Sequence, residues 1–77
     1  MNKMRRKEID EAIELLDQAK SIIESAMEEE QDALDNLPES LQDGERGEVM
    51  QSAIDELEAA SIAVEEAMGA AGDAKGE

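Results

Sequence analysis

The 77-residue sequence has no cysteine, no histidine and no aromatic residue. Without cysteine and histidine there is no disulfide framework, no activated thiol, no usual general base and no common zinc or di-iron site. Without aromatics the core consists of Ile, Leu, Val, Met and Ala, and the larger of these contribute roughly 1.5–3 kcal/mol each when buried. So small a core favours self-association. We expect no enzymatic activity and no cofactor.

Basic residues are scarce and long apolar runs are absent. The sequence contains seven Lys and Arg residues and 22 Asp and Glu residues, which gives a net charge of −15. This charge repels nucleic acid and anionic lipid and favours a basic protein surface. No apolar run approaches the ~20 residues of a membrane span. The residues after the initial MNKMRRK are amphipathic and acidic, unlike a secretion signal, so we expect a cytoplasmic protein.

Alanine recurs at seven-residue intervals in both halves of the chain, a helical period. The alanines are Ala12, Ala19, Ala26, Ala33, Ala53, Ala60, Ala67 and Ala74. Larger residues flank them on either side and are expected to mediate self-association: Ile9, Ile13, Leu16, Ile23, Met27, Leu34, Met50, Ile54, Leu57, Val64 and Met68. We expect the alanines to form the contact between two helices of one chain, because small side chains let helices approach closely.

The pattern predicts an all-α single domain, an antiparallel two-helix hairpin. The expected parts are a helix over about 4–35, a loop over 36–43, a helix over about 44–69 and a flexible tail over 70–77. Pro38 ends the first helix and Asp43 is placed to cap the second. The larger apolar rows would stay partly open, and a second copy covering them would give a four-helix bundle.

Three polar residues, Lys20, Glu30 and Ser61, occupy apolar positions of this pattern. Lys20 and Glu30 either extend to the edge of the bundle or pair across a dimer interface and fix its register.

A separate basic cluster at the start of the first helix opposes the helix macrodipole. Either Glu65, Glu66 and Asp73 neutralise this cluster or it binds an anionic ligand. The cluster consists of Lys3, Arg5, Arg6 and Lys7.

Acidic residues form two outward rows on the first helix: Asp10, Asp17 and Glu24 in one, and Glu14, Glu28 and Asp35 in the other. They are either a solvated face or a binding surface, which would mimic nucleic-acid phosphates or dock onto a basic groove. The tip between the helices offers a second set, Glu39, Asp43, Glu45 and Arg46. We interpret the tip first as a connector and second as a binding site. It lacks the central glycine of a calcium loop, so no metal site is expected.

The tip pattern NLPESLQ-x-x-ERGE (36–48), the start MNKMRRKEID and the acidic, alanine-spaced second helix resemble small acidic helical-hairpin proteins of bacteriophages and prophages. The resemblance extends to about Met68 and implies a phage setting, in the host cytosol, without implying an activity. A second likeness, in architecture, is to the plasmid copy-control protein Rop, a helical hairpin that dimerises. Its RNA binding needs a basic face that this sequence lacks.

These features favour a non-enzymatic acidic protein that inhibits a host defence or nucleic-acid-handling protein. The expected partners are a second copy of the chain and a host protein with a basic surface, without direct contact to nucleic acid or membrane. One alternative is an oligomeric bundle that sequesters a nucleotide immune signal. Another is a structural or scaffold component of a phage particle.

Overall fold

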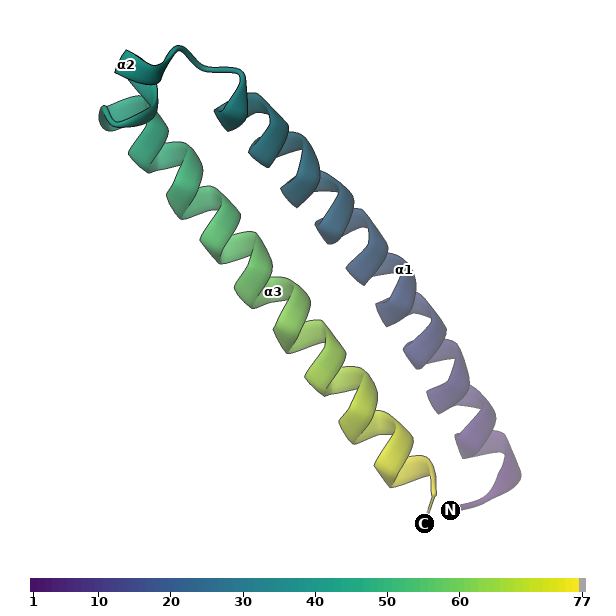
Figure 1. Ribbon diagram of the computed structural model, residues 1–77. Coiled ribbons are helices and arrows are strands. Elements are labelled where there is room, and N and C mark those ends of the chain that lie inside the picture. Colours follow the sequence, from purple (N-terminus) through teal and green to yellow (C-terminus); the bar gives the residue numbers. More distant parts are fainter. Residues whose placement is uncertain (77) are drawn as a thin grey trace.

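The protein folds as two long helices lying side by side, joined by a short helical turn (Figure 1). The computed structural model describes residues 1–76 and contains α1 (Lys3–Asp35), α2 (Glu39–Gln42) and α3 (Glu45–Lys75). The start of α1 and the end of α3 lie at one end of the pair, and α2 lies at the other. No strand occurs among the described residues. The predicted all-helical class is therefore confirmed, whereas assembly into a four-helix bundle stays a prediction.

Three contacts between α1 and α3 set their direction and register. Lys75 Nζ lies 2.6 Å from Asp10 Oδ1, Lys20 Nζ lies 3.7 Å from Glu65 Oε2, and Ser61 Oγ lies 3.5 Å from Glu24 Oε1. As the position in α1 rises, the position of its partner in α3 falls by the same amount. The helices are therefore antiparallel and in one continuous register.

The helices meet along a seam whose positions alternate by three and four residues, as in coiled coils. Every seam position is buried or half-buried. In α1 the seam comprises Ile9, Ile13, Leu16, Lys20, Ile23, Met27, Glu30, Leu34 and Leu37, the last just beyond the helix; in α3 it comprises Gly47, Met50, Ile54, Leu57, Ser61, Val64, Met68, Ala71 and Lys75. The residues expected to mediate self-association thus lie in the seam of a single chain.

The predicted alanine contact between the helices is wrong. Five of the eight alanines are exposed, namely Ala12, Ala26, Ala33, Ala67 and Ala74, and the other three are half-buried. Each of them directly precedes a seam position, so the alanine rows lie on a flank of the seam. The larger side chains take the contact because burial stabilises by roughly 0.8 kcal/mol per CH₂ group, and alanine has little to bury.

The helix ends differ from the expected ones in several details. The side chain of Asn2 caps α1 by accepting a hydrogen bond from Arg5 N at 2.8 Å. The expected loop contains α2. Asp43 does not cap the second long helix: the N-cap of α3 is Gly44, which has no side-chain hydrogen bond. α3 continues past the expected end near residue 69 to Lys75, and residue 77 of the expected tail lies outside the described residues.

Replacing Gly69 by alanine is expected to stabilise the protein by about 0.5–1 kcal/mol. Glycine within a helix costs this much relative to alanine, because it loses more backbone freedom on folding. A Cβ atom at Gly69 has no neighbour within 4 Å that would oppose the change. Urea unfolding followed by circular dichroism measures the difference. A lower unfolding midpoint for Gly69→Ala would show that α3 is not helical at this position.

Candidate functional site

Exposed carboxylates from both long helices gather on one side of the seam. In α1 each of these carboxylates directly follows a seam position, as Glu24 follows Ile23. The contacts of Glu24 with Ser61 and of Lys20 with Glu65 place the corresponding side of α3 on the same flank. We define the acidic face as Asp10, Glu14, Asp17, Glu24, Glu28 and Asp35 of α1 with Glu48, Asp55, Glu58 and Glu65 of α3. All ten residues are exposed.

The six acidic residues of α1 were predicted as outward rows, and they are exposed as expected. The four acidic residues of α3 were not predicted to belong to this surface. The seven-residue repeat could have indicated them, because Glu48 and Asp55 are seven residues apart, as are Glu58 and Glu65. Only the direction and register of the two helices show that both sets belong to one face.

The spacing of these charges resembles that of a nucleic-acid strand. Residues 10–35 of a helix span about 38 Å at 1.5 Å per residue. Ten carboxylates lie along this length, and Lys20 and Lys75 pair with three of them. The net charge of −8 gives one negative charge per roughly 5 Å, against about 3.4 Å for one DNA strand and 1.7 Å for the duplex. The acidic face therefore approaches the linear charge density of a single strand.

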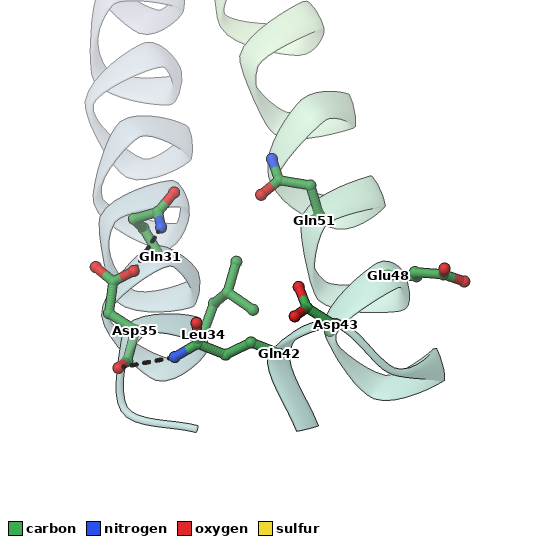
Figure 2. A pocket seen from close by; sticks show the side chains of 8 residues that line it. Gln31, Leu34, Asp35, Gln42, Asp43, Glu48 and Gln51 are labelled. Carbon is green, nitrogen blue, oxygen red and sulfur yellow. Dashed lines mark hydrogen bonds between the residues drawn. The ribbon is translucent and has the colours of Figure 1, made fainter. Parts of the chain in front are cut away.

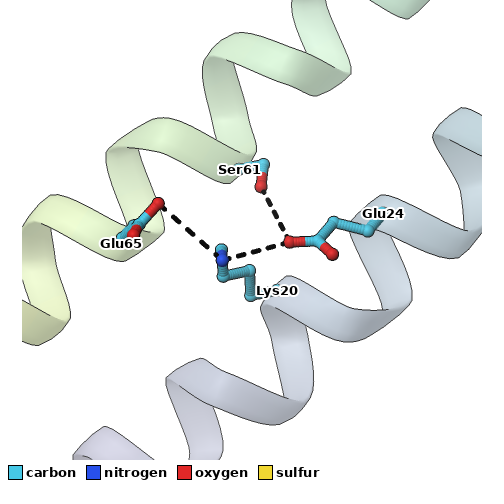
Figure 3. Close-up of polar contacts among 4 residues, drawn as sticks. All are labelled: Lys20, Glu24, Ser61 and Glu65. Atoms are coloured by element: carbon cyan, nitrogen blue, oxygen red, sulfur yellow. Dashed lines mark hydrogen bonds and ion pairs between the residues drawn. The ribbon is translucent and has the colours of Figure 1, made fainter.

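Lys20 connects the two helices within the acidic face (Figure 3). Its Nζ lies 3.1 Å from Glu24 Oε1 in α1 and 3.7 Å from Glu65 Oε2 in α3, and Ser61 Oγ donates to the same Glu24 oxygen. Lys20 therefore pairs within one chain, where it favours the observed register. Glu65, expected to neutralise the N-terminal basic cluster, pairs with Lys20 instead.

The environment of Lys20 predicts a pH dependence of stability at alkaline pH. The hydrogen bond to Glu24, and then the charges of Glu24 and Glu65, raise the pKa of Lys20 above its ordinary value of 10.5. Since the folded state binds this proton more tightly, the stabilisation that Lys20 contributes is complete below about pH 10.5 and is lost as pH rises through the raised pKa. Between pH 10 and 12, the wild type should lose more stability than Lys20→Met in urea unfolding. Equal losses would contradict this role.

The tip of the hairpin forms a shallow hollow whose polar groups bind one another (Figure 2). Gln42 Nε2 donates to the backbone oxygens of Leu37 at 2.8 Å and Asp35 at 3.4 Å, and Gln31 Nε2 donates to Asp35 Oδ1 at 3.0 Å. The hollow is lined by Gln31, Leu34, Asp35, Gln42, Asp43, Gly47, Glu48 and Gln51. These hydrogen bonds hold α2 against the end of α1, which supports the interpretation of the tip as a connector.

The predicted tip residues Glu39, Asp43, Glu45 and Arg46 are all exposed. Asp43 lines the hollow, whereas the other three do not. Within the described part of the chain, Arg46 makes no ion pair. The structure therefore does not bring these four residues together into one site.

The basic cluster of Lys3, Arg5, Arg6 and Lys7 is exposed at the opposite end. A surface hollow there is lined by Lys3, Met4, Arg6, Lys7 and Asp10. Asp10 pairs with Lys75 at 2.6 Å, so a carboxylate already lies at the edge of any anion site. This arrangement supports an anionic ligand less well than the acidic face supports a basic one.

Comparison of the chain with protein-family models, curated proteins and solved structures finds no match in any of the three. Across residues 1–76, no group of three or more acidic side chains is arranged to hold a metal ion. None of the helices within that range combines the length and apolarity needed to cross a membrane.

Proposed function

We propose that this chain is a non-enzymatic binding protein that docks its acidic face onto a basic surface of another protein. The supporting observation is the alignment of ten exposed carboxylates on one side of two paired helices. Paired helices hold these charges at fixed spacing, so docking requires little ordering of the backbone. Complementary charge also accelerates association and disfavours acidic competitors.

The spacing of the acidic face favours a particular kind of partner, a protein whose basic groove normally holds single-stranded nucleic acid. Such grooves carry cations that follow a strand with one phosphate per about 3.4 Å. One net negative charge per roughly 5 Å offers them a similar ladder, whereas a duplex-binding surface meets about three times that density. Bound in this way, the hairpin would exclude the nucleic acid and inhibit its partner.

The resemblance of the tip to phage and prophage proteins gives this inhibition a setting: the partner is a host protein of defence or nucleic-acid handling.

The hairpin also acts as a homodimer in this proposal. Ile54, at 6% exposed, is the only buried hydrophobic residue among the described ones in one copy, so a single hairpin has a very small core. A second copy would bury more apolar surface.

Affinity capture with matched charge reversals tests the acidic face. One variant carries Glu14→Lys, Glu28→Lys and Glu58→Lys on the acidic face. The control carries Glu11→Lys, Asp32→Lys and Glu66→Lys, three exposed acidic residues on the outer edges of the helices. The two variants have the same net charge, so they differ only in where the charges lie.

We expect a protein captured by the wild type from bacterial lysate to be retained by the control and lost with the acidic-face variant. Single-stranded DNA should displace that protein from the wild type. If both variants retain it, or if DNA does not compete, the acidic face is not the docking surface.

A further inference from the structure

The side of the hairpin opposite the acidic face is apolar. In both helices an alanine precedes a seam residue, as Ala12 precedes Ile13 and Ala53 precedes Ile54. Because the helices are antiparallel, equivalent positions of the repeat lie on the same flank, so both alanine rows share one side. We define the alanine face as the eight alanines spaced by seven, with Leu15 and Ile22 of α1 and Val49, Ala63 and Ala70 of α3 on its outer edges.

Large apolar side chains are open to solvent on this face. Leu15 is 64% exposed, Ile22 is 70% exposed and Val49 is 65% exposed. Between residues 12 and 33 of α1 and between 49 and 74 of α3, the only charged residues on these rows are Glu29 and Glu56. The two alanine rows between those edges carry no charge, and an exposed apolar surface of this kind marks an interaction site.

We infer that the alanine face binds the alanine face of a second copy, with the two hairpins head to tail. This inference rests on the self-association included in the proposed function, and it is independent of docking by the acidic face. It reverses the expected assembly, because the larger apolar rows close the single hairpin and the alanines join the two copies.

The repeat explains why a second copy fits this face. Alanines spaced by seven residues recur every ~10.5 Å along both helices. Identical rows on a second copy have the same period, so the small side chains can interdigitate over the full length. Helices that meet through alanine approach to the short end of the 8–10 Å range, which maximises dispersion contacts.

The area of the face meets the requirement of a stable dimer. The Cα positions extend over 58 × 14 × 11 Å, so the face is long and narrow. The overlap of two such faces along paired helices of ~45 Å buries about 600 Å² on each copy, or ~1,200 Å² in total. This value lies at the lower end of specific interfaces.

The distribution of charge favours the head-to-tail arrangement. One end of the hairpin carries the cations Lys3, Arg5, Arg6 and Lys7, while the tip between residues 35 and 48 carries five carboxylates and one guanidinium. Head-to-tail pairing places each basic end beside the acidic tip of the other copy. This attraction offsets part of the repulsion between two chains of charge −15, and both acidic faces remain outward.

Two isoleucines on opposite sides of the hairpin provide a matched test. Ile22 lies on the alanine face, and Ile62, 51% exposed, lines a hollow on the acidic face with Glu24, Glu58 and Glu65. Ile22→Glu and Ile62→Glu make the same chemical change. Sedimentation equilibrium should show a dimer for the wild type and Ile62→Glu, and a dissociation constant at least ~100-fold weaker for Ile22→Glu, because a carboxylate would be buried in the interface.

Ala26→Glu on the same face serves as a second variant, and circular dichroism verifies that each variant keeps its helices. A monomeric wild type at high micromolar concentration would overturn the inference. So would equal effects of Ile22→Glu and Ile62→Glu. Neither result would affect the capture test of the acidic face, which a monomer can pass.

A charge swap tests the orientation of the two copies. One variant carries Lys3→Glu, Arg5→Glu and Lys7→Glu, which change the charge of the basic cluster from +4 to −2. Another carries Glu39→Lys, Asp43→Lys and Glu45→Lys, which change the charge of the tip from −4 to +2. Each alone should dimerise at least ~10-fold more weakly than the wild type, because each basic end or tip meets a like charge. Mixed together, they should form a heterodimer of wild-type affinity, because both ends then meet opposite charges. Failure of the mixture to recover affinity would overturn the head-to-tail arrangement.

Discussion

Replacing Gly47 by alanine is expected to lower the free energy of unfolding by about 3 kcal/mol. A Cβ atom at this position would lie 1.8 Å from the backbone oxygen of Gln42 and 2.5 Å from its carbonyl carbon. These are backbone atoms, so no side-chain rotation relieves the clash, and overpacking of this kind costs about 1–3 kcal/mol or more. Urea unfolding measures the loss.

At Gly47 the backbone of α2 approaches α3 closely, which explains why the tip needs a glycine there. Gly44 provides the control, since a Cβ at Gly44 would lie 3.6 Å from Leu41 O, an ordinary contact. Gly44→Ala should cost only about 0.5–1 kcal/mol, because alanine is a poorer N-cap residue than glycine. Similar losses for the two substitutions would show that α2 does not pack on Gly47.

The same contact predicts a structural signature beyond stability. In Gly47→Ala the turn α2 should detach, and the hydrogen bonds from Gln42 to Leu37 and Asp35 should be lost with it. Hydrogen exchange at residues 37–44 should then accelerate more than exchange in the middle of α1.

The helical class followed directly from the seven-residue repeat, but the arrangement of the repeat around each helix did not. The larger residues and the alanines have the same period, so the period alone does not say which row faces the partner helix. Burial decides it: Ile54 is 6% exposed, whereas Ala26 and Ala67 remain open. The choice between the two rows depends on the apolar area that each residue buries, and this area favours packing of the larger, branched side chains against the partner helix.

The acidic surface was predictable within one helix and not across two. Asp10, Asp17 and Glu24 share a row because of the period of their own helix. Glu58 and Glu65 join them only because α3 returns antiparallel in the register that the Lys20–Glu65 contact marks. The end of α3 was also predicted wrongly, because Gly69 and Gly72 do not end the helix. Each isolated glycine costs only about 1 kcal/mol within a helix, and the seam continues to Lys75.

Replacing Ile54 by alanine is expected to remove roughly 2–3 kcal/mol of stability, most of what a core of this size supplies. Ile54 is the most buried hydrophobic side chain among the described residues, at 6% exposed. The loss should lie in the lower part of the range for such substitutions, because a seam between two helices can partly close around the cavity.

Ile62 offers the matched control, since it lies on the same helix and is 51% exposed. Ile62→Ala should change stability by less than about 1 kcal/mol, because the small loss of burial is offset by the higher helix propensity of alanine. Both variants must be unfolded at one protein concentration, since a dimer adds stability by mass action. If the two substitutions cost the same, α1 and α3 do not meet along the seam, and the assignment of the acidic and alanine faces fails with it.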